Sequence, residues 1–328
     1  MKLSVLDQSV ISSGSDARSA LKNTVRLART AEELGYTRFW VAEHHNSNGM
    51  AGTAPDILIS HIASQTSRIR VGSGGVLLPQ YSPFKVAENF KLLESLYPGR
   101  IDLGIGRSPG GGAETRNALN DGVKRSMNEF PNQIRNLQGF LYGGEHDFAN
   151  VTAYPETESL PETWLLGITQ RGARMAAEHG TAFTYGHFIT PANGRIALDH
   201  YFDHFVPSRH LKEPKANVCI FVVCADTQEK AEELALSQDM WLLSLERNKD
   251  TRIPSAEEAR RIALTAEQRE KLSENRKRAV IGTPDKVREE LLLLQELYGT
   301  DEFMIITNIH DFEAKIRSYT LLADALLA

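Results

Sequence analysis

The sequence predicts an α/β fold, a (β/α)8 TIM barrel with an insertion between its seventh strand and seventh helix. Short apolar runs typical of buried strands alternate along the chain with amphipathic stretches of helical spacing. Eight strands and eight helices can be placed in this way. The 328 residues suffice for one barrel of ~250 residues with added segments, so we expect a single domain over residues 1–328.

Four strand–helix units make up the first part of the chain. Their strands are expected at residues 3–6, 37–42, 69–78 and 101–105. Gly35 ends the first helix, and Thr53 is expected to cap the second. Ser82 followed by Pro83 is typical of the N-cap and first turn of the third helix. This regular alternation favours a parallel sheet with helices packed outside it.

The second part of the chain resumes the same alternation. Its strands are expected at residues 163–167, 182–185, 217–225 and 303–307. Gly180 ends the helix after the fifth strand, a helix from Thr283 to Tyr298 precedes the eighth, and Asp311 caps the closing helix. Residues 226–278 are charged and helical in pattern. We interpret them as a helical insertion over the barrel mouth and a candidate lid.

Composition and charge exclude several classes of protein. The formal net charge of -5 argues against a general nucleic-acid or anionic-membrane surface. No run approaches the ~18 apolar residues of a membrane span, and the first ten residues fit a strand better than a signal peptide. Cys219 and Cys224 are separated by an odd offset on one strand, so they should face opposite sides, and neither a disulfide nor a shared metal is expected. These features fit a reducing cytoplasm.

The first candidate site is the stretch YPGRIDLGIGRSPGGG at residues 97–112. A buried run ends there at Gly106 and Arg107, before a loop rich in glycine. This is how α/β enzymes build an anion site at the carboxyl end of a strand, because glycine lets backbone approach a ligand and arginine offers a fixed fork to phosphate. A plain strand and turn with a surface arginine is the alternative. A GxGxxG dinucleotide fingerprint fits poorly, since Pro109 replaces the third glycine and no helix is expected directly afterwards.

Glu43, His44 and His45 directly follow the second predicted strand. A histidine at a strand end can move protons or polarise a substrate oxygen. Adjacent residues that leave a strand point to opposite sides, so we expect one histidine to face the barrel mouth. The alternative is a loop histidine in a helix-cap network, and no HExxH or other ligand spacing indicates a metal.

Gly72, Gly74 and Gly75 interrupt the third apolar run. Glycine weakens a strand interior unless a bulge, an unusual backbone state or a close ligand requires it. A pair of glycines at the strand end could support a flat ring against bare peptide, and a barrel-closing bulge is the alternative.

The segment GITQRG at residues 167–172 precedes a helix. Helix N-termini bind phosphate through free amide groups, and here Thr169 adds a hydroxyl and Arg171 a charge. An ordinary N-cap is the alternative. Together with Arg107, this segment predicts one phosphate held between two successive barrel strands.

The chain resembles the bacterial-luciferase-like, flavin-dependent monooxygenases in three segments: FWVAEHHNSNG, RIRVGSGGVLLP and YPGRIDLGIGRSPGG. The opening LSVLDQS and the closing VIGTPDKVREELLLLQELYGTDEFMIIT and SYTLLADAL are similar to the same family. The likeness covers residues 1–112 and 279–326, is looser over 163–186 and is weak across the insertion.

The resemblance implies that the barrel binds reduced FMN at the carboxyl ends of its strands. Gly74 and Gly75 match the pair that supports the isoalloxazine ring, where the family often has a non-proline cis peptide. His44 matches the active-site histidine, which would act as acid or base near the reactive edge of the flavin. Gly106 departs from luciferase itself, which has a cysteine there, so the role of that thiol does not carry over.

The resemblance also implies where the FMN phosphate binds. Arg107 matches the phosphate-binding arginine, and Thr169 and Gly172 fall in the phosphate-binding segment before a helix. This segment departs from many relatives, which have a more serine-rich sequence there. We also expect Arg171, in the same segment, to contact the cofactor.

The implied activity is that of a monooxygenase. It inserts one oxygen atom of O2 into a small organic substrate and releases the other as water, using FMNH2 as a cosubstrate supplied by a separate flavin reductase. We expect a cytoplasmic homodimer with no nucleic-acid, membrane or metal partner. Two alternatives stay open: a deazaflavin-dependent oxidoreductase of the same fold, and a non-catalytic flavin-binding subunit.

Overall fold

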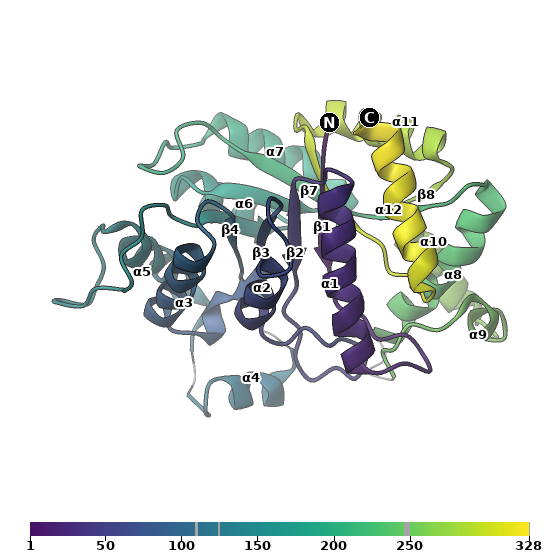
Figure 1. Cartoon of the computed structure of the whole chain (residues 1–328), viewed down its shortest axis with the longest axis horizontal. Helices are drawn as coiled ribbons and strands as arrows, with labels where there is room; N and C mark the ends of the chain where they lie inside the picture. Colours follow the sequence, from purple (N-terminus) through teal and green to yellow (C-terminus); the bar gives the residue numbers. More distant parts are fainter. Residues whose placement is uncertain (109–110, 124, 246–249, 328) are drawn as a thin grey trace.

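The computed structural model describes residues 1–108, 111–123, 125–245 and 250–327, with a closed parallel barrel at the centre (Figure 1). The ring is made of β1 (Lys2–Asp7), β2 (Arg38–Val41), β3 (Arg70–Leu77), β4 (Ile101–Gly106), β5 (Glu162–Gly167), β6 (Ala182–Gly186), β7 (Ala216–Cys224) and β9 (Glu302–Ile306). Strands β1 to β7 pair in chain order, and β9 closes the ring between β7 and β1. The predicted (β/α)8 barrel is confirmed.

Each strand of the ring is followed by at least one helix, and eight of these helices form the strand–helix units of the barrel. These helices are α1 (Ala17–Glu33), α2 (Pro55–Ala63), α3 (Pro83–Leu96), α5 (Phe130–Tyr142), α6 (Gln170–Glu178), α7 (Gly194–Asp203), α11 (Pro284–Tyr298) and α12 (Phe312–Leu326). The predicted caps Ser82 and Asp311 are confirmed, and the Asp311 carboxylate accepts a hydrogen bond from the Ala314 amide. The prediction for Thr53 is wrong, because α2 begins at Pro55 and its N-cap is Ala54.

Some elements of the described chain were not predicted. Strand β8 (Ala279–Gly282) pairs with the last four residues of β7 and lies outside the ring. Helix α4 (Ala113–Leu119) begins only six residues after Arg107, so it does not follow the β4 end directly, and Pro109 lies outside the described residues. Short 3-10 turns occur at Leu78–Gln80, Met127–Glu129 and Pro191–Asn193.

The insertion consists of α8 (Gln228–Leu245), α9 (Ala256–Arg260) and α10 (Ala266–Arg276), which Figure 1 shows grouped beside α12. Its segment 250–253 contacts the loops that follow β1 and β2. The Ile253 amide donates to the Ile11 carbonyl at 2.9 Å, and the Thr251 and Ser47 hydroxyls lie 2.8 Å apart. The insertion is thus attached to the strand-end loops on the His44 side of the barrel.

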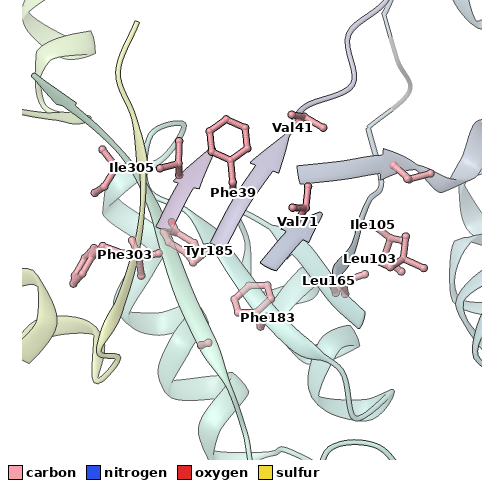
Figure 2. Packing of buried hydrophobic residues seen from close by; sticks show 14 of the residues in the cluster. Phe39, Val41, Val71, Leu103, Ile105, Leu165, Phe183, Tyr185, Phe303 and Ile305 are labelled. Carbon is pink, nitrogen blue, oxygen red and sulfur yellow. The ribbon is translucent and has the colours of Figure 1, made fainter. Parts of the chain in front are cut away.

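Alternate residues of each strand belong to two apolar layers. Phe39, Leu103 and Phe303 are among those that face outward and pack under the helices, in the layer that Figure 2 shows. Their neighbours, such as Trp40 and Met304, face the barrel interior. Cys224 lies in the outer layer and Cys219 in the inner one, and both are free thiols, as their spacing predicted.

A buried ion cluster fills the amino end of the barrel interior. Arg38 donates to Asp102 and to Glu302, both at 2.8 Å, and Arg70 Nε donates to Asp102 at the same distance. Trp40 Nε1 donates to Asp102 as well. Burial by itself raises the pKa of Asp102, but the two guanidinium groups outweigh it and hold that pKa below its ordinary value. The amino end of the described interior therefore carries buried charges that are paired with one another.

Strands β3 and β4 approach each other closely through glycine. The register of the pair shifts between Ser73 and Val76, which is the predicted bulge. A Cβ atom added at Gly104 would lie 2.0 Å from the Ser73 carbonyl oxygen, and one at Gly75 would lie 2.7 Å from the Gly104 carbonyl oxygen. A Cβ at Gly106 would meet nothing nearer than 3.9 Å. Side chains are thus excluded inside this contact and tolerated at its end.

We expect Gly104→Ala to lower the free energy of unfolding by about 1–3 kcal/mol or more, because the added methyl group forces β3 and β4 apart. Gly106→Ala serves as the matched variant and should stay within about 1 kcal/mol of the parent. Urea unfolding followed by circular dichroism measures both. Equal losses in the two variants would contradict the proposed importance of the contact.

Candidate functional site

A cavity of about 910 Å³ lies at the carboxyl ends of the barrel strands. It is lined by the eight residues predicted from the sequence as the site: His44, Gly74, Gly75, Gly106, Arg107, Thr169, Arg171 and Gly172. They come from the interior of β3, from the ends of β2, β4 and β5, and from the start of α6. Because parallel strands all end at the same rim, residues far apart in sequence meet here.

Glu43 holds the loop that carries His44. Its buried carboxylate accepts hydrogen bonds from the Leu77 amide at 2.9 Å and the Tyr81 hydroxyl at 2.6 Å, and its Oε1 lies 2.7 Å from His45 Nε2. Both histidine side chains line the cavity, so the expectation that one faces away is too simple. They differ in bonding, since His45 is paired with Glu43 whereas the buried Nδ1 of His44 has no partner among the described residues.

Burial lowers the pKa of His44 to about 4, and the neighbouring His45 adds to this effect. His44 is therefore a neutral imidazole at pH 7. A neutral ring can accept a proton at one nitrogen or donate a hydrogen bond from the other, which suits a group that works beside a ligand.

The peptide bond between Gly74 and Gly75 is cis, as the resemblance predicted. A Cβ at Gly74 would lie 2.5 Å from Leu6 Cδ1, so the barrel interior excludes a side chain there. Both glycines also line the cavity. The two explanations of this glycine pair, a bulge and a bare peptide surface, therefore apply together. Gly106 lines the same cavity with open space where a side chain would start.

The N-terminus of α6 and two arginines give the cavity a positive side. Thr169 is the N-cap of α6, and its hydroxyl oxygen accepts a hydrogen bond from the Gly172 amide at 3.2 Å. The ordinary capping role is thus confirmed, and the hydroxyl proton stays available to a ligand. Arg107 and Arg171 are exposed and form no ion pair with the described residues. Free amides, a helix dipole and two guanidinium groups together suit a phosphate.

Local sequence motifs did not reveal the side of the cavity formed by β1, β6, β7 and β9. Gln8, Thr184, Cys219 and Met304 line it. The alternation of each predicted strand would have identified these inward positions once the outward ones were known. Cys219 is fully buried, and burial raises the pKa of its thiol well above the ordinary value, so it stays a thiol.

The described residues fit a flavin nucleotide. An anion fits the side with Arg107 and Arg171, and His44 presents a buried nitrogen without a partner. The cavity volume lies within the range of about 300–1,000 Å³ that cofactor sites occupy. Among these residues no group of three or more His, Cys, Asp and Glu side chains could hold a metal ion, and no described helix is long and apolar enough to cross a membrane.

Comparison with known proteins identifies the family. Residues 1–301 match the family model described as luciferase-like monooxygenase. The chain is 51% identical to the uncharacterized protein YceB and 36% identical to an N-acetyl-S-alkylcysteine monooxygenase, both from Bacillus subtilis. The first match covers 99% of each chain, and the second covers 100% of this chain and 99% of the relative.

Solved structures agree on the architecture. The crystal structure of apo-MsnO8 matches with a TM-score of 0.91 and 37% identity, over 99% of this chain and 98% of that one. Two more distant structures share the fold. One is the oxygenating constituent of 3,6-diketocamphane monooxygenase from Pseudomonas putida in complex with FMN (TM-score 0.74, 20% identity, 99% and 98% covered), and the other is an F420-dependent secondary alcohol dehydrogenase (0.70, 15%, 99% and 98%). The barrel, its cavity and these matches lead to one conclusion: the chain belongs to the luciferase-like monooxygenase family.

Proposed function

We propose that this protein is an FMN-dependent monooxygenase that uses reduced FMN from a separate reductase, together with O2, to oxygenate a small organic substrate. One observation carries the proposal: the positive start of α6, the two arginines, His44 and the Gly74–Gly75 peptide all line one cavity. The relative named N-acetyl-S-alkylcysteine monooxygenase supports the oxygenation chemistry.

In this proposal the FMN phosphate binds between Arg107 and the N-terminus of α6. A guanidinium group forms paired hydrogen bonds to phosphate oxygens, and the free amides at the helix start donate to the others. Arg171 adds charge from the first turn, and Thr169 can donate its hydroxyl proton. The close approach of Gly172 to Gly167, where a Cβ at Gly172 would lie 3.4 Å from Gly167 Cα, brings the helix start next to β5.

The Gly74–Gly75 peptide, Gly106 and His44, which line the same cavity, would hold the ring end of the flavin. Reduced FMN supplies the electrons that activate O2. His44 would accept or return a proton at its unpaired Nδ1, from an orientation that the Glu43 network holds. The mainly apolar lining keeps water away, and residues 226–278 would act as a lid of this single domain.

The two alternatives differ from this proposal in cofactor and in catalysis. The F420-dependent dehydrogenase, which shares the fold at 15% identity, is the support for the deazaflavin alternative. Relatives that are named as monooxygenases are more than 30% identical to this chain, which favours the monooxygenase. A non-catalytic subunit would have no need for His44 and Arg107 on one cavity. A homodimer in the cytoplasm belongs to the same proposal and follows from the family resemblance.

Arg107→Ala should weaken the binding of reduced FMN about 10- to 150-fold, because hydrogen bonds to charged groups contribute about 1.5–3 kcal/mol each. Arg174→Ala is the matched control, since Arg174 lies on the same helix as the proposed phosphate site but is exposed and paired with Glu178. Anaerobic titration measures both affinities. The proposal fails if Arg107→Ala binds reduced FMN as tightly as Arg174→Ala does.

The buried His44 also affects how the stability of the protein changes in acid. The folded state lowers the pKa of His44 to about 4 from 6.5, so its contribution to stability is present above pH 6.5 and is lost as the pH falls toward 4. His44→Gln should therefore lose less stability between pH 7 and pH 5 than the parent, as measured by urea midpoints. His61→Gln changes an exposed histidine on α2 and should follow the parent. A parent-like slope for His44→Gln would contradict the buried neutral histidine.

A further inference from the structure

The described lining of the cavity is charged on one side and uncharged on the other. Its ionisable side chains Glu43, His44, His45, Arg107 and Arg171 follow β2, β4 and β5. The opposite side comes from β1, β6, β7 and β9, and we call it the uncharged wall. Its side chains include Leu6, Gln8, Thr184, Phe188, Met304 and the protonated thiol Cys219.

Among the described residues of this wall, only Thr184 has a buried side-chain polar atom without a hydrogen-bond partner. It is 3% exposed, and its Oγ1 atom is buried without a hydrogen bond. The two residues beside Thr184 in the sheet do not supply a hydrogen-bond partner for this hydroxyl. Leu166 of β5 is apolar, and both polar side-chain atoms of Asn217 on β7 are themselves without a partner among the described residues. A buried hydroxyl without a partner costs about 1–3 kcal/mol, and an oxygen of a ligand in the cavity would recover part of it.

We propose that the uncharged wall binds the substrate, and that this substrate is an uncharged, mainly apolar molecule whose single hydrogen-bonding oxygen is held by the Thr184 hydroxyl. The inference rests on the proposed function, which assigns the charged side of the cavity to the FMN phosphate. An anionic substrate on this wall would lose its hydration without meeting a cation, which is costly. The volume of about 910 Å³ lies near the upper end of the range for single ligands, which leaves room for a substrate beside a cofactor.

Three small molecules of nearly the same shape test the proposal: acetophenone, α-methylstyrene and benzoate. The second replaces the carbonyl oxygen of the first by a methylene group, and the third replaces its methyl ketone by a carboxylate. Protein labelled with ¹³C in the methionine methyl groups reports where each binds, because Met304 lies on the uncharged wall and Met175 lies on α6. Acetophenone should shift the Met304 signal and bind about 3- to 10-fold more tightly than α-methylstyrene. Benzoate should leave Met304 unshifted.

Thr184→Val removes the hydroxyl and should abolish the preference for acetophenone over α-methylstyrene, while Thr184→Ser should retain it. Thermal unfolding confirms that both variants are folded. The inference is overturned if Thr184→Val keeps the preference, if benzoate shifts Met304 as acetophenone does, or if acetophenone leaves Met304 unshifted. Titration with FMN, followed at Met175, is the separate check on the proposed function. If FMN does not bind but Thr184→Val still abolishes the preference for acetophenone, the flavin assignment is rejected while the assignment of the uncharged wall to the substrate is retained.

Discussion

The close contact between β3 and β4 determines where the site residues lie. Glycine at positions 75 and 104 allows the two backbones to approach, and the register of the pair shifts at the same place, between Ser73 and Val76. Beyond this bulge, Leu77 pairs with Gly106 and donates its amide to Glu43. The contact therefore connects parts of three consecutive strands: the glycine pair within β3, the β4 end that leads into Arg107, and the loop after β2 that carries His44.

The two ends of the barrel differ in how their buried polar groups are paired. At the amino end, Arg38 and Asp102 form a buried, hydrogen-bonded cluster whose charges compensate one another. At the carboxyl end, the buried nitrogen of His44 and the hydroxyl of Thr184 lack partners among the described residues and line a cavity. A buried polar group without a hydrogen bond raises the free energy of the unliganded protein, and a ligand can lower it by supplying the missing bond. This contrast is the physical reason to assign function to one end only.

Local sequence patterns predicted the barrel because short apolar runs alternate with helical stretches, and because several helices begin or end with a recognisable residue, as α3 does at Ser82 and α12 at Asp311. The Gly74–Gly75 pair and Arg107 could be singled out for the same reason. Strand β8 could not, because four residues after a charged helix carry no distinct period, and its partner is the end of β7 rather than the ring. The role of Glu43 depends on the Leu77 amide, and that of Thr184 on its surroundings on β5 and β7. Such contacts join segments far apart in the chain, which a local pattern does not reveal.

The most direct test of this account is a crystal structure of the protein with FMN bound. The account predicts that the phosphate contacts the Arg107 guanidinium group and the first amides of α6. The ring should lie against the Gly74–Gly75 peptide with His44 at its edge, and the uncharged wall should remain open to a second molecule. A phosphate bound away from both Arg107 and α6, or a ring that lies on the uncharged wall, would contradict it.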